Sequence, residues 1–430
     1  MASWYRSYDV AYLRDPDDNR PNCDPRGGRS LFCLNRYKSP LARLDLEPVH
    51  PFYSLILNSY PTTPFHPLSR LQSQLSHDSS PVITMSIPKT QKQWLITGAD
   101  KGLDGLVYQD APVPTPGDHE VLVHLRGASL NYRDLIIPRG MYPFPLNLPV
   151  VACSDGAGEV VAVGSKVTKW KKGDKVLTLF NQGHQRGDMD IAASKTGLGG
   201  CFDGTLRQYG TFAETGVAKM PSNLNYVESA SLVCAGLTSW NALYGLKPLK
   251  KGQWVVTQGT GGVSLFALQF AKAAGAHVIA TTSTAEKAEM LKKLGADHVI
   301  NYREDVNWGE TARKLTPGGE GVEHVIEVGG ADTFTQSLSA VKMEGVISVI
   351  GFLGGAAPKD NILETLSRVC TVRGVYVGSR EQLEAMCAEI EKHDIHPVMD
   401  KTVFTLEKAK EAYEYMWAKK HTGKIPITIE

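Results

Sequence analysis

The strongest constraint on the fold is a series of short apolar strands that alternate with helices, beginning at residue 254. Strands are predicted at 254–258, 277–282, 298–302, 324–328 and 345–352, and helices at 263–274 and 285–294. Strands that are joined through helices of this length run parallel, because each helix returns the chain to the same edge of the sheet. The pattern therefore predicts an α/β unit with a doubly wound parallel sheet.

A glycine-rich turn joins the first of these strands to the first helix. It contains the predicted cofactor contacts Gly259, Thr260, Gly261, Gly262 and Val263, and Ser264 takes the place of a third glycine. Glycines allow the backbone to approach a ligand closely, and the start of a helix offers free N–H groups to a pyrophosphate. A plain turn without a ligand is the alternative, but the position between strand and helix favours a dinucleotide site.

The residues after the second strand indicate which dinucleotide is bound. NAD sites usually carry an acidic residue there for the ribose 2′-hydroxyl, whereas this chain has Thr-Thr-Ser-Thr at 281–284, followed by Lys287. Hydroxyl groups and a lysine suit a 2′-phosphate. We therefore predict that Ser283 and Lys287 bind NADP(H), with Tyr302 beside the adenine. The alternatives are a capping box formed by Ser283 and Glu286 and a solvated lysine.

The rest of the chain has a different texture. Short β-rich runs punctuated by Gly and Pro predict a mainly β domain over 85–225, completed by residues 366–430, and the cofactor domain then spans 226–365. Residues 1–84 hold ten of the 24 prolines and show no sustained helical or strand period. We expect this segment to be a disordered tail, or a leader upstream of a start at Met85.

Charge and cysteine content narrow the class of protein. Lys and Arg total 46 against 45 Asp and Glu, so the chain has no basic surplus for a nucleic acid. It also has no run of about 18 uncharged apolar residues that could cross a membrane. Its seven scattered cysteines include no C-x-x-C pair, which is typical of reduced thiols. We expect a cytoplasmic protein with a small-molecule substrate, and no nucleic-acid or membrane partner.

Several longer motifs occur in an order that resembles a known superfamily. They are LNYRD, DGAGEVVAVGSKVTKWKKGDKV, AGLTSWNAL and GTGGVSLFALQFAKAAGA. Together, over residues 90–430, the chain resembles the medium-chain dehydrogenases/reductases, in particular the zinc-free branch with quinone oxidoreductases and enoyl reductases. The resemblance implies a GroES-like catalytic domain, a Rossmann NADP(H) domain and a possible homodimer.

Zinc members of that superfamily carry a catalytic Cys in the first motif and Gly-His-Glu before the second. This chain has Asn131 at or near the first place and Cys153-Ser154-Asp155 at the second. The four-cysteine zinc lobe of the superfamily is also missing, because Cys201 is the only cysteine between 181 and 205. Zinc requires three or four ligands, with thiolates and imidazoles preferred. We therefore predict an enzyme that binds no metal, with Cys153 and Cys234 as small core residues.

Without a metal, a nicotinamide can deliver hydride to a carbon that is already electrophilic, such as an activated alkene (enone or enoyl) or a quinone. The resemblance implies that Asn131 contacts the substrate or nicotinamide and that Tyr142 donates a proton. A tyrosine of ordinary pKa, about 10, is a donor at neutral pH. Helix capping by Asn131 and pocket lining by Tyr142 are the alternatives. The alternatives to a reductase are an alcohol dehydrogenase and a non-enzymatic, crystallin-like protein that binds NADPH.

The remaining predicted site residues come from strand ends and from the same resemblance. Thr238 resembles the residue that faces the nicotinamide carboxamide, and Gly329, Gly351 and Phe352 follow the fourth and fifth strands, where α/β proteins bind ligands. The polar segment 181–205 is expected to be a mobile surface loop beside the cleft. His184 and His393 are expected at the surface.

Overall fold

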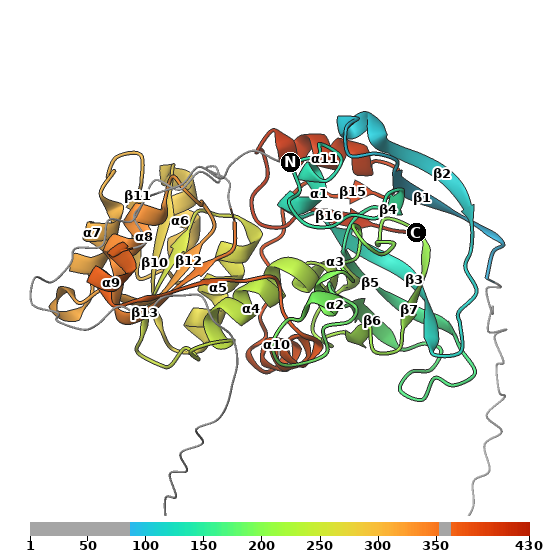
Figure 1. Cartoon of the computed structure of the whole chain (residues 1–430), viewed down its shortest axis with the longest axis horizontal. Coiled ribbons are helices and arrows are strands. Elements are labelled where there is room, and N and C mark those ends of the chain that lie inside the picture. Colours follow the sequence, from blue (N-terminus) through green and yellow to red (C-terminus); the bar gives the residue numbers. More distant parts are fainter. Residues whose placement is uncertain (1–86, 352–362) are drawn as a thin grey trace, which may run out of the picture. The chain divides into compact units, whose positions relative to one another are not determined.

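The computed structural model describes residues 87–351 and 363–430 (Figure 1). Six parallel strands form the sheet of the α/β unit, in the order β11-β10-β9-β12-β13-β14. They are β9 (Trp254–Gln258), β10 (His277–Thr282), β11 (His298–Asn301), β12 (Val322–Glu327), β13 (Val341–Val349) and β14 (Thr371–Gly374). The order changes direction between β9 and β12, so the predicted doubly wound sheet is confirmed.

Side chains that alternate along these strands enter two different cores. Val255 and Val278 pack in the same core as Phe266 of helix α5, whereas their neighbours Val256 and Ile279 belong to a second core. This alternation shows that both faces of the sheet are covered. The helices of the unit are α4 (Leu237–Tyr244), α5 (Gly262–Ala273), α6 (Ala285–Lys293), α7 (Trp308–Lys314), α8 (Phe334–Ala340), α9 (Leu363–Arg368) and α10 (Arg380–His393).

The preceding region is built on two mainly antiparallel sheets, with orders β15-β16-β3-β5-β6-β8 and β2-β1-β4, and β7 pairs with β3. The strands are β1 (Thr90–Ile96), β2 (Leu106–Pro112), β3 (Glu120–Ser129), β4 (Val150–Val151), β5 (Asp155–Val163), β6 (Lys175–Thr178), β7 (Tyr209–Ala213), β8 (Val217–Lys219), β15 (Phe404–Thr405) and β16 (Pro426–Thr428). The short helices are α1 (Tyr132–Ile136), α2 (Ile191–Ser194) and α3 (Tyr226–Ala230), followed late in the chain by α11 (Ala409–Trp417).

The last strand brings the end of the chain into this β-rich region. In Figure 1, β16 lies beside β3, and Pro426 pairs with Ser129 in an antiparallel register. The residues just before β16 reach the glycine turn of the α/β unit, because Gly423 forms a bridge to Gly261. The C-terminal segment therefore contacts both regions that the sequence predicts to form the site.

The segment 181–205 differs in part from its prediction, because its middle is exposed as expected whereas its two ends are buried. It was expected to lie at the surface, but Asn181 and Leu198 are buried, and the Leu198 amide donates to the Phe180 carbonyl over 3.0 Å. His184 is also buried rather than exposed, and its Nε2 lies 2.9 Å from the Gly187 carbonyl oxygen. These contacts hold the ends of the polar segment against the β-rich core. The composition of the segment alone does not reveal them.

The region predicted as a disordered tail or leader, 1–84, lies outside the described residues. None of the helices in the described part of the chain is long and apolar enough to cross a membrane.

Candidate active site

The glycine turn leaves open space where a cofactor phosphate would lie. Gly259 adopts a φ of 75°, and α5 begins at Gly262. A Cβ atom placed on Gly259 or Gly261 would meet no heavy atom within 4 Å. The first N–H groups of α5 have no partner within the helix, so this open space and these donors fit the pyrophosphate of a dinucleotide.

Gly262 differs from the other glycines because its surroundings are already filled. A Cβ here would lie 2.7 Å from Cδ of Lys424 and 3.2 Å from Cβ of Ala235. Ser264, in place of the third glycine, donates from Oγ to the Gln258 carbonyl over 2.6 Å. This bond ties the first turn of α5 to the end of β9. The serine therefore keeps helix and strand close, as a glycine would.

Two polar side chains lock the ends of β9 and β12 together. Gln258 Nε2 donates to Glu327 Oε2 over 2.8 Å, and the Gln258 Oε1 accepts from Gly329 N over 3.2 Å. Glu327 Oε1 also accepts from Gly329 N and Gly330 N, at 2.8 and 2.9 Å. Both side chains lie where the strand order changes direction, which is where α/β proteins bind ligands, and they hold the turn after β12 in place. Neither was predicted as a site residue.

The predicted NADP(H) contacts lie at the ends of neighbouring strands. Ser283 follows β10, and Tyr302 follows β11 with 42% of its surface exposed. The proposed capping box is wrong: the N-cap of α6 is Thr284, whose Oγ1 accepts from Lys287 N over 3.3 Å. Ser283 is therefore not needed to start the helix, which leaves its hydroxyl available for a ligand.

The other predicted cofactor residues belong to α4 and to the turns after β12 and β13. Thr238 is buried in the first turn of α4, and Gly329 belongs to the turn held by Glu327. Gly351 lies after β13, and a Cβ there would come within 2.4 Å of the Val328 carbonyl oxygen. Close packing therefore explains why this position requires a glycine. Phe352 lies outside the described residues.

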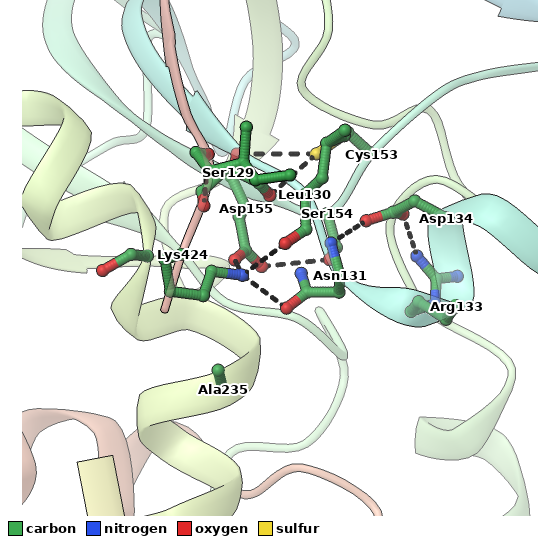
Figure 2. A network of polar contacts seen from close by, with 12 residues as sticks. Ser129, Leu130, Asn131, Arg133, Asp134, Cys153, Ser154, Asp155, Ala235 and Lys424 are labelled. Carbon is green, nitrogen blue, oxygen red and sulfur yellow. Dashed lines mark hydrogen bonds and ion pairs between the residues drawn. The ribbon is translucent and has the colours of Figure 1, made fainter. Parts of the chain in front are cut away.

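Asn131 belongs to a buried polar cluster that contains a lysine ammonium group (Figure 2). Lys424 Nζ donates to Asn131 Oδ1, to the Leu130 carbonyl and to Asp155 Oδ2, over 2.6, 2.7 and 3.0 Å. Lys424 and Asp155 are both buried. Asn131 Nδ2 is buried too and has no hydrogen-bond partner among the described residues. The stem of Lys424 packs on Gly262, so this cluster adjoins the cofactor turn.

Burial raises the pKa of Asp155 to about 6, and the nearby carboxylate of Asp134 acts in the same direction. The ammonium group of Lys424 opposes both effects. Asp155 is therefore a carboxyl group held ionised at neutral pH by one cation, and it would titrate well above an ordinary aspartate.

This raised pKa predicts an unusual pH dependence of stability. Because the folded protein holds the Asp155 proton more tightly than the unfolded chain, this group lowers the free energy of unfolding as pH rises from about 4 to about 6, by up to about 1.4 kcal/mol per pH unit. Denaturant unfolding of the natural chain and of an Asp155→Asn variant across this range measures the difference. A difference between them that does not vary with pH would contradict the assignment.

A second set of contacts connects Asn131 to Tyr142. Asn131 N donates to Asp134 Oδ2 over 2.8 Å, so Asn131 is the N-cap of helix α1, as the alternative predicted, and its side-chain oxygen also accepts from Lys424. Asp134 pairs with Arg133 at 3.2 Å. Arg133 Nε in turn lies 3.4 Å from the hydroxyl of Tyr142, which is 3.2 Å from that of Tyr376. The two predicted catalytic residues are thus joined through one ion pair.

Comparison with known proteins agrees with this architecture. Residues 117–222 match the model of the alcohol dehydrogenase GroES-like domain, and residues 262–392 match that of zinc-binding dehydrogenases. A zinc-type alcohol dehydrogenase-like protein of Schizosaccharomyces pombe is 46% identical over 338 residues, covering 76% of this chain and 96% of the relative. The chain belongs to the medium-chain dehydrogenase/reductase superfamily.

Solved structures of other superfamily members are also similar. The chain is 36% identical to a putative alcohol dehydrogenase from Sinorhizobium meliloti 1021, with a TM-score of 0.74 over 80% of this chain and all of that one. A quinone oxidoreductase from Pseudomonas syringae pv. Tomato DC3000 is 26% identical, with a TM-score of 0.67 over 79% and 99% of the two chains. A mycobacterial protein complexed with NADPH is 28% identical, with a TM-score of 0.66 over the same shares.

Within this superfamily, the zinc-ligand positions of this chain do not fit a metal. Ser154 donates its hydroxyl hydrogen to Asp155 Oδ1 over 3.1 Å. The other carboxylate oxygen of Asp155 and the side-chain oxygen of Asn131 both accept from Lys424. Cys153 is buried as predicted, with Sγ 3.3 Å from the Ser129 carbonyl oxygen, whereas Cys234 is only partly buried. In the described ranges, no three His, Cys, Asp or Glu side chains are grouped to hold a metal ion.

Lys424, Arg133 and Tyr376 were not predicted as site residues. Lys424 stands next to Ile425, which is buried, and Arg133 lies in a motif that ends in the buried Leu135; a charged residue in such a place needs a partner. That signal was available in LNYRDL and GKIPI. Tyr376 had no comparable signal, because its role depends on a contact with a residue 234 positions away.

Proposed function

We propose that this protein is an NADPH-dependent, zinc-independent reductase that transfers hydride to an activated alkene or a quinone. The observation that carries the proposal is the ammonium group of Lys424, bound by Asn131 Oδ1 and Asp155 Oδ2. These two residues match positions at or next to the zinc ligands of the zinc-dependent branch. A lysine cation at these positions supports a reaction that requires no metal. Oxidation of an alcohol differs, because there a metal acidifies the hydroxyl group.

The surrounding groups fit such a reaction. A bound nicotinamide supplies the hydride. The amide Nδ2 of Asn131, buried and without a partner in the described part of the chain, can donate to a substrate or cofactor oxygen. Tyr142 can donate a proton, and Thr238 and the turn at Gly329 remain the predicted contacts of the nicotinamide. Donors that are fixed in place before the reaction stabilise the charge that develops on oxygen.

The preference for NADPH rests on the residues after β10. Lys287→Ala is expected to raise the Kd for NADPH by about tenfold, because a hydrogen bond to a charged phosphate is lost. The Kd for NADH should change little, since NADH lacks the 2′-phosphate. Fluorescence titration of both nucleotides measures this. Lys293→Ala, near the other end of α6, is the control, and equal weakening of NADH and NADPH would contradict the assignment of Lys287.

Turnover separates the three candidate functions. The similarity to proteins named alcohol dehydrogenases favours alcohol oxidation as the second candidate. The reductase predicts NADPH oxidation by a quinone or an enone in the presence of a chelator. The alcohol dehydrogenase predicts NADP⁺ reduction by an alcohol that depends on a metal, and a non-enzymatic NADPH-binding protein predicts binding without either reaction. The possible homodimer stays a prediction, which size measurement in solution can test.

A further inference from the structure

Tyr142 and Tyr376 form the outer end of a chain of donors that begins at a buried cation. Arg133 Nε lies 3.4 Å from the Tyr142 hydroxyl oxygen, and the two tyrosine hydroxyl groups are 3.2 Å apart. In a pair of hydroxyl groups, one donates its hydrogen to the other, so the second keeps a hydrogen for a further acceptor. The pair therefore offers one O–H group, and its direction can reverse.

The charge of Arg133 is already balanced, so it acts on the tyrosines rather than on an anionic substrate. Its Nη1 donates to Asp134 Oδ1 over 3.2 Å and to the Leu198 carbonyl over 3.0 Å. Its guanidinium group also lies 5.1 Å from the ring centre of Tyr142 and 4.8 Å from that of Phe180. The cation is thus fixed behind the hydroxyl pair, where it can stabilise a phenolate.

Tyr376 is held in position by aromatic neighbours and keeps its proton. It comes from the segment between β14 and α10, and its ring centre lies 4.8 Å from that of Phe144 and 5.8 Å from that of Phe180. Burial, together with the nearby Tyr142, raises the pKa of Tyr376 above the ordinary value for tyrosine. A group of this kind is protonated at neutral pH, so it is available as a donor and does not act as a base.

An unpartnered amide lies close to the same hydroxyl group. Asn181 is fully buried, and neither its Oδ1 nor its Nδ2 has a hydrogen-bond partner among the residues that the structure describes. A Cβ placed on Gly197 would lie 3.5 Å from Asn181 Oδ1 and 3.7 Å from the Tyr376 hydroxyl oxygen. Both polar groups therefore lie on the same side of Gly197. An unsatisfied buried amide is costly, and a polar ligand atom would satisfy it.

From these contacts we propose that Tyr376 is a second catalytic residue, which forms with Tyr142 a proton-donating pair for the substrate oxygen, and that Asn181 positions that oxygen. This inference rests on the proposed function. A bound nicotinamide would supply the hydride. The substrate oxygen that gains negative charge would then take a proton from one tyrosine. The other tyrosine passes its own proton to the first, and a proton from solvent restores the pair. One hydride and one proton are consumed in each two-electron reduction.

The test removes each hydroxyl group while keeping the ring. Tyr376→Phe and Tyr142→Phe are each expected to lower kcat for NADPH oxidation by a naphthoquinone and by cyclohexenone by about 10²-fold or more, with KM and the Kd for NADPH unchanged. The Tyr142→Phe/Tyr376→Phe double variant should be no slower than the slower single variant, because the hydroxyl groups act as one unit. Tyr209→Phe, a partly buried tyrosine stacked on His124, is the matched control.

The outcomes separate this inference from the proposed function. If the natural chain turns over but Tyr376→Phe keeps its kcat, the proposed function stands and the role of Tyr376 is refuted. A change confined to KM, or losses that multiply in the double variant, would also refute a shared proton. If the natural chain binds NADPH and oxidises it with neither substrate, the proposed function fails, and the proton-donor role fails with it.

Discussion

Replacing Lys424 by methionine is expected to lower the free energy of unfolding by about 3–5 kcal/mol at neutral pH, because a buried carboxylate then loses its cation. Methionine preserves the apolar stem that packs on Gly262, so the change is mainly electrostatic. The carbonyl of Leu130 and Oδ1 of Asn131 lose their donor as well. Denaturant unfolding followed by fluorescence and circular dichroism measures the loss.

A second variant isolates the cause of this loss. Adding Asp155→Asn to Lys424→Met removes the unpaired charge and should recover part of the stability. The loss of unfolding free energy in Lys424→Met should also be smaller at pH 5 than at pH 8. At pH 5 Asp155, with a pKa of about 6, is mostly neutral and needs no cation. A loss that is the same at both pH values and is not reduced by Asp155→Asn would show that packing, rather than the ion pair, makes Lys424 important.

The second large effect is expected at Glu327, which holds the turn after β12. Its carboxylate accepts from Gly329 N, Gly330 N and Thr333 Oγ1, at 2.8, 2.9 and 2.6 Å, and from Gln258 Nε2 at 2.8 Å. Glu327→Gln would place an NH2 group against one set of these donors. We expect a loss of about 2–3 kcal/mol in the free energy of unfolding, because buried donors are left without an acceptor.

The same substitution should weaken cofactor binding, since the turn at Gly329 lies where the strand order changes direction. Titration of NADPH into Glu327→Gln should give a higher Kd than titration into the natural chain. Glu310→Gln is the matched control, because the Glu310 side chain is 65% exposed and its substitution affects only an ion pair with Lys314, at 3.8 Å. If Glu327→Gln were as stable as the control variant and bound NADPH equally well, the network would not shape the turn.

The fold was largely predictable because its signal is local. Apolar strands such as 277–282 and the helix after the glycine turn need only their own periodicity and the flanking glycines to be recognised. The observed bounds differ little: β10 covers His277–Thr282, and α5 begins one residue early, at Gly262. The strand predicted at 345–352 begins earlier, at Val341, because its first residues pair beside Val322 of β12.

The site was predictable only in part, because its chemistry depends on contacts across the chain. The glycine turn is a continuous motif, so its position between strand and helix could be predicted directly. The partner of Asn131 is Lys424, 293 positions away, and no local pattern connects the two. The buried part of 181–205 was missed for the same reason: its polar composition resembles a surface loop, yet Leu198 accepts a hydrogen bond from Arg133, 65 positions earlier.

The rate of NADPH oxidation by a quinone, before and after exhaustive dialysis against a zinc chelator, tests the central proposal most directly. The measurement uses the full chain, with its zinc content determined on the same samples. We expect NADPH to be oxidised at the same rate before and after dialysis, with far less than one zinc per chain. Loss of the rate on dialysis and its return on adding Zn²⁺ would contradict the account and indicate a zinc-dependent dehydrogenase.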